Sequence, residues 1–285
     1  MKLNLIPIVL ALSLAAGAST ASAQLIAAKD APIAYGHHHL NVTSIAAQKK
    51  FFVDTLGGVP MTLAGGRELV KFPNALVMLR EQKPTGGNRG TTVNHLGFTV
   101  PNLQQTLDKM KANGFKVVTK EEGPSNLEVV GDIGHYPGRA IGLAYVLGPD
   151  DLKLELVENK EQKVPVIANH VHFFGQQNEE MQAWYVKVFG AKPGAPGGLF
   201  PSASLPGVGL AFSPSTTPVV GTQGRVIDHI GFEVKNLPEL LKKVEAMGIK
   251  PVNVRQVPEI NVSIGFITDP WGTYIELTEG LDKIE

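Results

Sequence analysis

The chain has 285 residues, 26 basic and 26 acidic side chains, a formal net charge of zero and no cysteine. The balanced charge and the lack of any Lys/Arg-rich run argue against nucleic acid and anionic membranes as partners, which leaves a small molecule as the expected ligand. Without thiols the chain can form neither disulfides nor cysteine-ligated zinc sites, so a bound metal would have nitrogen and oxygen ligands.

Residues 1–23 resemble a secretory leader. Lys2 gives a basic start, an apolar run extends from about Leu5 to Ala16, and small residues precede Gln24. This pattern is typical of a cleaved signal peptide, and no later stretch approaches the roughly 20 apolar residues that a membrane helix needs. We therefore expect a periplasmic or secreted protein whose fold begins after this segment.

The first predicted strand is HHHLNV, residues 37–42, which has a β-favouring composition. A helical pattern follows and ends at Gly57, and RELVKF and ALVMLREQ, within residues 67–82, predict further strands. The same order then recurs. HLGFTV (95–100) predicts a strand, and LQQTLDKMKANG (103–114) predicts an amphipathic helix closed by glycine.

The second part of the chain repeats the first. Residues 36–58 align with 169–191 at a shift of 133 positions (170 minus 37), and residues 93–118 align with 227–252 at a shift of 134 (229 minus 95). A third match ends in one glutamate from each half. Each half thus carries His, His and Glu in that order, namely His37, His95 and Glu155, then His170, His229 and Glu276.

The order of strand, helix and several strands occurs four times along the chain. It predicts an α+β fold built from four β-α-β-β-β modules. The polar stretch at 159–166 contains Pro165 and suits a linker. We therefore expect two domains, at 31–160 and 165–280, each made of two paired modules.

These residues resemble the vicinal oxygen chelate superfamily, which includes glyoxalases, extradiol dioxygenases, epimerases and bleomycin resistance proteins. The resemblance covers nearly all of the chain after the leader and rests on the first histidine of each half, the aromatic pair after it, NHLGFTV or DHIGFEV, and DPWGTYIEL. It implies glyoxalase-like half-barrels that each surround a divalent metal. It also implies ligation within each half, by His37, His95 and Glu155 in the first and by His170, His229 and Glu276 in the second.

Two imidazoles and one carboxylate suit iron(II) or manganese(II) and leave neighbouring positions open for a substrate with two adjacent oxygens. The metal would act as a Lewis acid and lower the pKa of an enol or a catechol. Zinc and nickel accept the same donors, so the ligand types do not decide the ion. The alternative is an inherited pattern that one or both halves no longer use.

Strand alternation separates the three consecutive histidines, because His37 and His39 face one way and His38 faces the other. The second half repeats the first pair as His170 and His172. We expect His39 and His172 to face the metal cavity as acid/base groups, as substrate contacts or, at a register two residues away, as ligands. His38 is expected to be a solvent-facing or packing residue.

The first half is longer between its second histidine and its glutamate, with 60 residues (155 minus 95) against 47 (276 minus 229). The extra glycine-rich segment supplies His135, and Tyr145 follows it shortly before Glu155. The resemblance to extradiol dioxygenases implies that these two residues transfer a proton and hold a substrate hydroxyl. An ordinary loop histidine and a core tyrosine are the alternatives. Phe266 takes the matching place in the second half.

Two functions of different classes fit this sequence. One is a metal-dependent enzyme, an extradiol dioxygenase ahead of a glyoxalase or epimerase, because each half offers His-His-Glu and ALVMLREQ has a further carboxylate only at Glu81. The other is a small-molecule-binding module without turnover, like the drug-sequestering members of the superfamily. Stoichiometric metal would favour the enzyme. A monomer and a homodimer are both compatible with the sequence.

Overall fold

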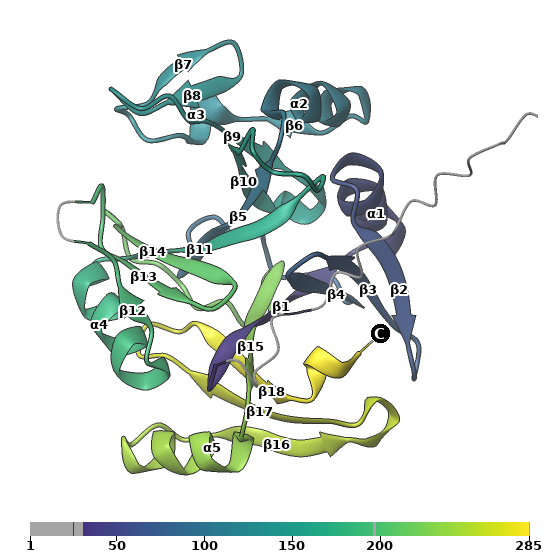
Figure 1. Ribbon diagram of the computed structural model, residues 1–285, viewed down its shortest axis with the longest axis vertical. Helices are drawn as coiled ribbons and strands as arrows, with labels where there is room; N and C mark the ends of the chain where they lie inside the picture. Colours follow the sequence, from purple (N-terminus) through teal and green to yellow (C-terminus); the bar gives the residue numbers. More distant parts are fainter. Residues whose placement is uncertain (1–24, 26–30, 196–197, 285) are drawn as a thin grey trace, which may run out of the picture.

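The computed structural model describes residue 25, residues 31–195 and residues 198–284 (Figure 1). The predicted leader, residues 1–23, lies outside the described residues. Four modules follow one another along the chain, which confirms the α+β fold of β-α-β-β-β units. None of the described helices is long and apolar enough to cross a bilayer.

Each module begins with a long strand and continues with a helix. Module 1 contains β1 (Ile33–Val42), α1 (Ile45–Lys49), the π-helical turn η1 (Lys50–Thr55), β2 (Val59–Leu63), β3 (Arg67–Phe72) and β4 (Ala75–Glu81). Module 2 contains β5 (Val93–Val100), α2 (Leu103–Ala112), β6 (Lys116–Val117), α3 (Thr119–Glu122), β7 (Glu128–Val130), β8 (Ile133–His135), β9 (Gly142–Leu147), η2 (Pro149–Asp151) and β10 (Lys153–Glu158). Module 3 contains β11 (Ile167–Gly175), α4 (Asn178–Phe189), β12 (Lys192–Pro193), β13 (Ser202–Leu205) and β14 (Val208–Pro214). Module 4 contains β15 (Ile227–Val234), α5 (Leu237–Ala246), β16 (Val252–Val257), η3 (Pro258–Ile260), β17 (Val262–Thr268) and β18 (Tyr274–Glu279), before a last short turn, η4 (Leu281–Lys283).

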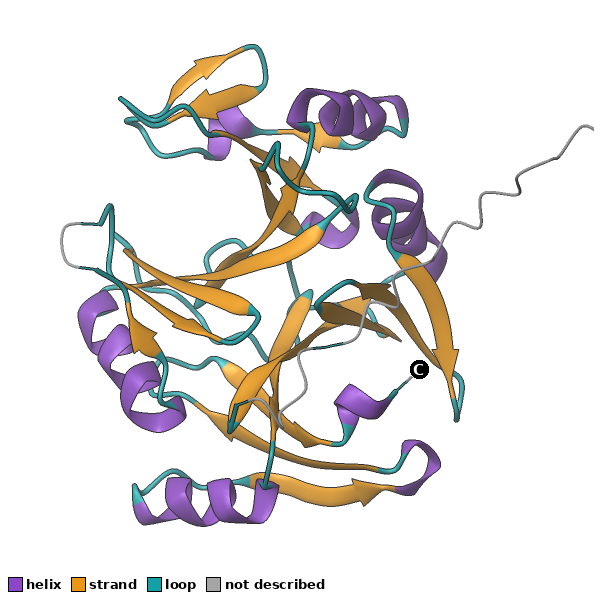
Figure 2. Ribbon diagram, in the orientation of Figure 1, coloured by secondary structure: helices purple, strands orange, loops and turns teal. Residues whose placement is uncertain are grey.

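The modules form two sheets, with the larger helices placed around their outside (Figure 2). The eight-stranded sheet joins module 1 to module 4 in the order β16-β17-β18-β15-β1-β4-β3-β2. The ten-stranded sheet joins module 2 to module 3 in the order β12-β13-β14-β11-β5-β10-β9-β8-β7, and β6 pairs with β9. Each sheet therefore combines one module from 31–160 with one from 165–280, and neither sheet is built from one half of the repeat.

This exchange corrects the expectation that modules pair within each half. The first strands pair antiparallel across the halves, β1 with β15 and β5 with β11. The two segments that cross between the sheets, 82–92 and 215–226, also bond to each other. Val226 N donates to Gly86 O at 2.9 Å, and Thr92 N donates to Val220 O at 2.9 Å. Because these crossings satisfy each other's backbone groups, the exchanged arrangement leaves fewer of these polar groups unpaired at the junction.

Local sequence signals account for the helix boundaries. Asn102 and Asn236 cap α2 and α5, since their side-chain oxygens accept from the backbone N–H of the third residue along. Gly190 ends α4 in the left-handed conformation, at a φ of 68°. These helices bury one apolar face against the sheets, which positions the first strands of the modules.

The faces of β1 divide as alternation requires. His38 is 1% exposed and lies on the side away from His37, where the Tyr35 hydroxyl is 2.5 Å from its Nδ1. Its ring also packs edge-on against Phe98 of β5 in the other sheet. His38 is therefore a packing residue between the two sheets, and the opposite face of β1 carries His37 and His39.

Candidate metal centres

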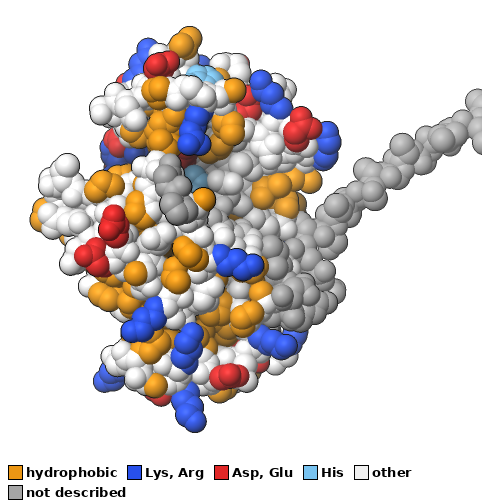
Figure 3. All heavy atoms as spheres, turned by 60° about the vertical axis from the view of Figure 1, so that its left-hand side comes forward, with side chains coloured by type: hydrophobic (Ala, Val, Ile, Leu, Met, Phe, Trp, Pro, Cys, Tyr) orange, Lys and Arg blue, Asp and Glu red, His pale blue; other side chains and the backbone are white. Residues whose placement is uncertain are grey.

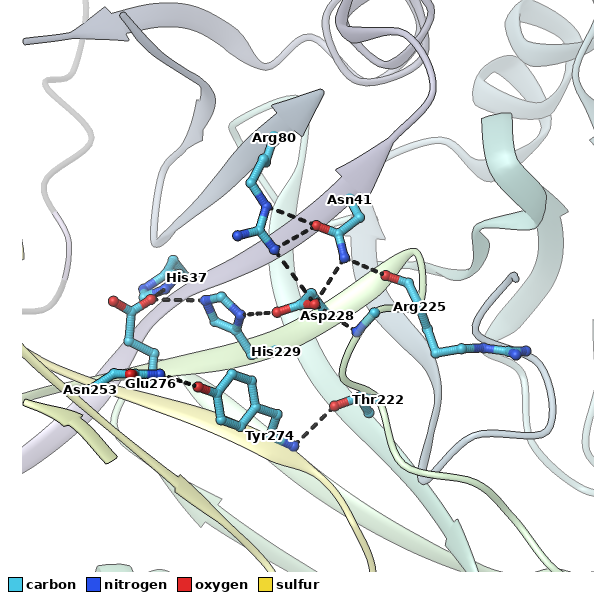
Figure 4. Close-up of polar contacts among 11 residues, drawn as sticks. His37, Asn41, Arg80, Thr222, Arg225, Asp228, His229, Asn253, Tyr274 and Glu276 are labelled. Atoms are coloured by element: carbon cyan, nitrogen blue, oxygen red, sulfur yellow. Dashed lines mark hydrogen bonds and ion pairs between the residues drawn. The ribbon is translucent and has the colours of Figure 1, made fainter. Parts of the chain in front are cut away.

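The first cluster joins the two ends of the chain. The imidazoles of His37 in β1 and His229 in β15 point at one carboxylate, that of Glu276 in β18 (Figure 4). His37 Nε2 lies 2.8 Å from Glu276 Oε2, and His229 Nε2 lies 2.9 Å from the same oxygen. All three residues are more than nine-tenths buried.

The second cluster has the same plan in the other sheet. His95 of β5 and His170 of β11 flank the carboxylate of Glu155 in β10. His95 Nε2 lies 2.8 Å from Glu155 Oε2, and His170 Nε2 lies 3.2 Å from it. The two clusters thus bring together the six side chains that the repeat singles out.

The membership of the two clusters differs from the sets expected from the sequence. His37 lies with His229 and Glu276, and not with His95 and Glu155. Conversely, His170 lies with His95 and Glu155, and not with His229 and Glu276. The physical reason is the pairing of first strands across the halves, which carries the first histidine of each half to the other half's glutamate.

A glycine in each of the strands β5 and β15 makes room for the imidazole from the neighbouring strand. A β-carbon on Gly231 would lie 2.0 Å from His37 Cε1, and one on Gly97 would lie 2.1 Å from His170 Cε1. No real β-carbon tolerates such a contact. The glycine of HIG and HLG is therefore a steric requirement of the site, a role that the sequence analysis did not assign.

Three of the four histidines in these sets follow an Asp or Asn whose side-chain oxygen lies beside their Nδ1. The distances are 2.7 Å for Asp228 and His229, 2.9 Å for Asn94 and His95, and 2.7 Å for Asn169 and His170. A ring that donates Nδ1–H to this oxygen keeps the lone pair of Nε2 free for a metal. The sequence analysis missed these supporting residues, although the recurring Asx-His dipeptide was a usable signal.

Burial and hydrogen bonding set the charges of the clusters. Burial by itself raises the pKa of Glu276, but the hydrogen bonds with His229 and His37 outweigh it and hold this pKa well below its ordinary value. The pKa of Glu155 is lowered in the same way by its two histidines. Burial lowers the pKa of His95 to about 4, so this imidazole is neutral at pH 7. A carboxylate anion and a neutral imidazole are the forms that bind a metal.

His229 differs from His95 in its charge preference. Burial lowers its pKa, but hydrogen bonds with Asp228 and Glu276 outweigh burial and raise the pKa above its ordinary value. Metal binding at the first cluster would therefore compete with a proton on this ring.

The second histidine of each His-x-His pair, His39 or His172, lies beside a cluster. The ring centroid of His39 is 4.5 Å from that of His229, and the ring centroid of His172 is 4.5 Å from that of His95. His172 Nε2 lies 2.8 Å from Ser213 Oγ, and its buried Nδ1 has no partner among the described residues. His172 is close enough to act as a fourth donor in the second cluster, whereas the first cluster gathers three.

Tyr145 and Phe266 take corresponding places beside the two carboxylates. Tyr145 is paired with Glu155 across β9 and β10, and Phe266 is paired with Glu276 across β17 and β18. The Tyr145 ring centroid lies 5.3 Å from that of His95, and burial raises the pKa of its hydroxyl. This phenol therefore keeps its proton at neutral pH and can serve as a hydrogen-bond donor.

His135 is not brought to either cluster. It lies in β8 opposite Gly142, three residues before Tyr145 on β9, so the two side chains point to opposite faces of the sheet. A β-carbon on Gly142 would meet His135 Cε1 at 3.3 Å and Leu103 of α2 at 3.6 Å. His135 therefore faces the helix layer, and the expected proton-transfer role finds no geometric support.

The first cluster opens into a cavity of about 340 Å³ between module 1 and module 4. Its wall includes the cluster and His39, the apolar residues Met78, Ile264 and Phe266, and the arginines Arg67, Arg80 and Arg255. A cavity of this size suits a small ligand. At the second cluster, the ring centroid of Phe200, which precedes β13, lies 4.8 Å from that of His172.

The donors fit a divalent metal bound through nitrogen and oxygen. In each cluster two imidazole nitrogens converge on one carboxylate oxygen. Among the described residues, His37 Nδ1, His39 Nε2 and His172 Nδ1 are buried without a hydrogen-bond partner. Imidazole and carboxylate bind iron, manganese, zinc and nickel, so the donor set is compatible with each of these ions.

Comparison with known proteins finds one matching family model. A family model described as the Glyoxalase/Bleomycin resistance protein/Dioxygenase superfamily matches residues 167–277. This part of the chain is therefore similar to that superfamily. The superfamily region supplies His170, His229 and Glu276, and the internal repeat relates residues 36–158 to it. No curated protein matches the chain by sequence.

Solved structures share the fold over nearly the whole chain. Glyoxalase I from Zea mays has a TM-score of 0.66 at 16% identity, covering 88% of this chain and 94% of that one. A provisionally assigned dioxygenase from Bacillus subtilis subsp. subtilis str. 168 has a TM-score of 0.61 at 14% identity, covering 87% of this chain and 85% of that one. These likenesses establish the two-domain glyoxalase-like fold and leave the reaction to be argued from the site.

Proposed function

We propose that the protein is a metal-dependent enzyme that binds a small substrate through two adjacent oxygen atoms. The observation that carries the proposal is the convergence of His37, His229 and Glu276 at the wall of a cavity of small-molecule size. Three protein donors leave coordination positions open, which is typical of catalytic metal sites. The similarity of residues 167–277 to the superfamily model supports the same function.

The residues of the first cluster have separable tasks. His37, His229 and Glu276 would hold the ion, which would polarise the substrate oxygens as a Lewis acid. Asp228 orients the His229 ring through Nδ1. Burial and the neighbouring His229 hold the pKa of His39 well below its ordinary value, so its imidazole is neutral. Its Nε2 has no hydrogen-bond partner among the described residues and can accept a hydrogen bond from a substrate hydroxyl in the cavity.

Among reactions of this kind we place ring cleavage of a catechol ahead of isomerisation or epimerisation. Each cluster has two histidines and one glutamate, and the places that correspond to the glutamate in modules 1 and 3 hold Met78 and Ala211. Two histidines and one carboxylate with open positions are the donor set of non-haem iron oxygenases. A second carboxylate in either place would have favoured the other reactions.

Oxygen uptake tests this proposal. Protein loaded with iron(II) without air, and then supplied with air and a panel of catechols, should consume one O₂ per ring cleaved. His229→Ala should abolish the uptake, and His135→Ala, which changes a histidine outside both clusters, should leave it intact. Conversion of a thiol adduct of a 2-oxoaldehyde in place of O₂ uptake would indicate an isomerase. Protein that retains no metal would indicate non-catalytic binding.

We also propose that the enzyme works in the periplasm or outside the cell. The basis is the leader-like composition of residues 1–23. Cell fractionation with N-terminal sequencing should find a chain that begins near Gln24 outside the cytoplasm, and a full-length cytoplasmic chain would contradict it.

A further inference from the structure

We propose that the substrate of the first cluster carries a carboxylate, or a comparable oxyanion, at the end remote from its metal-binding oxygens. The proposal rests on the proposed function of this cluster as a metal centre. Its basis is that Arg67, Arg80 and Arg255 line the same cavity as His37 and Glu276. The arginines come from β3, β4 and β16, so both modules contribute positive charge.

The register of β3 and β4 places two of these arginines side by side. Leu69 is paired with Met78, a residue of the cavity wall. The pairing of the two strands ends at Glu68 and Leu79, and its continuation by one residue places Arg67 opposite Arg80, on the same face as Met78. Like charges in directly opposed positions destabilise a sheet unless an anion lies between them. The pair is therefore suited to hold an anionic ligand.

The protein's own carboxylates satisfy these two arginines only loosely. Arg67 Nη2 lies 3.8 Å from Glu259 Oε2, and Arg80 Nη2 lies 3.7 Å from Asp228 Oδ2, both beyond hydrogen-bonding distance. The closer partner of Arg80 is the uncharged Asn41, whose Oδ1 accepts at 2.7 and 3.0 Å (Figure 4). Guanidinium groups bind carboxylates and phosphates through paired hydrogen bonds, and these side chains remain partly open to such a ligand.

Arg255 approaches the cavity from the opposite wall. It is paired with Ile264, and Ile264 and Phe266 lie on the cavity face of β17. Because Phe266 is paired with Glu276, strand spacings place the Cα atoms of Arg255 and Glu276 roughly 12 Å apart. A substrate with one ring and a short acidic side chain spans such a distance.

The charge of the cavity wall also favours an anionic ligand. The charged residues in its wall are the three arginines, Glu259 and Glu276, and Glu276 would be bound to the metal. The cavity therefore remains positive when the metal is present, and it favours an anion. Elsewhere, on the face shown in Figure 3, basic and acidic side chains are interspersed.

A matched pair of ligands tests this inference. We would use 3-(3,4-dihydroxyphenyl)propanoate and its uncharged amide, which offer the same adjacent oxygens and the same length. Dissociation constants would be measured by calorimetry on manganese-loaded protein, in the wild type, Arg67→Gln, Arg255→Gln and the control Lys250→Gln. Lys250 is an exposed cation of module 4 outside the cavity wall. The phosphonate of the same length separates a carboxylate preference from a general oxyanion preference.

We expect the acid to bind the wild type at least tenfold more tightly than the amide. Each arginine substitution should reduce this ratio by about tenfold, the size of a lost charged hydrogen bond, while the control leaves it unchanged. The proposal would be overturned if the acid and the amide bound equally well, or if neither arginine substitution changed the ratio of their affinities. Failure of both ligands to bind metal-loaded protein would also overturn this proposal, but it would not contradict the proposed metal centre. Protein that takes up no metal but still prefers the acid through these arginines would instead contradict the proposed function.

Discussion

His37 and Glu276 are 239 positions apart in the sequence, and their side chains lie 2.8 Å apart in the fold. One belongs to the first strand of the first module and the other to the last strand of the fourth. This contact shows that the repeat does not assemble half by half. The two candidate centres draw their donors from modules 1 and 4, and from modules 2 and 3.

Alanine substitutions in pairs should reveal this grouping. His37→Ala and His229→Ala should each remove one metal per chain, and the double variant should remove no more than either alone. His37→Ala combined with His95→Ala should remove both metals, because the two residues lie in different clusters. Elemental analysis of chelator-washed, reloaded protein provides the measurement. Additive loss in the first double variant would contradict the grouping.

The steric role of the glycines predicts a selective defect. Gly231→Ala places a methyl group where the His37 ring lies, so the first cluster should lose its metal while the second keeps it. Gly97→Ala should do the reverse, because its neighbour is His170. Each variant is the control for the other, and metal content with circular dichroism gives the readout. Full metal content in both folded variants would show that the rings have another position available.

Removal of Asp228 should weaken metal binding without removing a ligand. Asp228→Ala leaves the His229 ring free to rotate, and the loss of such an outer partner costs about 10- to 100-fold in metal affinity. Asp228→Asn keeps an oxygen acceptor and should recover most of it. Competition with a fluorescent chelator measures the affinity. Equal loss in both variants would indicate that the charge of Asp228, and not its hydrogen bond, is what matters.

The two HxH pairs should behave differently toward cobalt(II). His172 is near enough to complete a four-donor set, so cobalt in the second cluster should give the intense visible bands of a four-coordinate ion. His172→Ala should weaken those bands, whereas His39→Ala should leave them unchanged. Spectra of variants that lack the first cluster through His229→Ala isolate the signal. If His172→Ala leaves the bands as strong as before, His172 is not a ligand.

The buried His38 should make the protein acid-sensitive. Burial lowers its pKa from 6.5 to about 3 in the folded chain, so the folded state resists protonation. Its stabilising contribution is complete above pH 6.5 and falls as the pH drops below that value, by about 2 kcal/mol between pH 7 and pH 5. His38→Gln should remove this part of the pH dependence in urea unfolding of metal-free protein. An unchanged pH slope would show that His38 is not the responsible group.

The sequence predicts the modules and the six donor residues because both can be recognised from short sequence patterns. Strand alternation separates His37 from His38, and the repeat links distant residues such as His229 and Glu276. The sequence does not reveal which modules pair, because all four modules have equivalent first strands. The pairing depends on contacts between strands, and between the connecting segments, that lie far apart in the chain. The same limit applies to His135, whose face depends on its register with Gly142.

The exchanged pairing has a consequence for the order in which the molecule is assembled. Modules 2 and 3 are adjacent in the chain, so their sheet can close as soon as β14 has been made, while β1 must wait for β15 at residues 227–234. Distant pairing of this kind slows folding, because a long intervening chain has to be ordered first. The second cluster should therefore form early and independently of the first. The first cluster can form only after module 4 has been synthesised, and a truncation that removes β1 or β18 would abolish it.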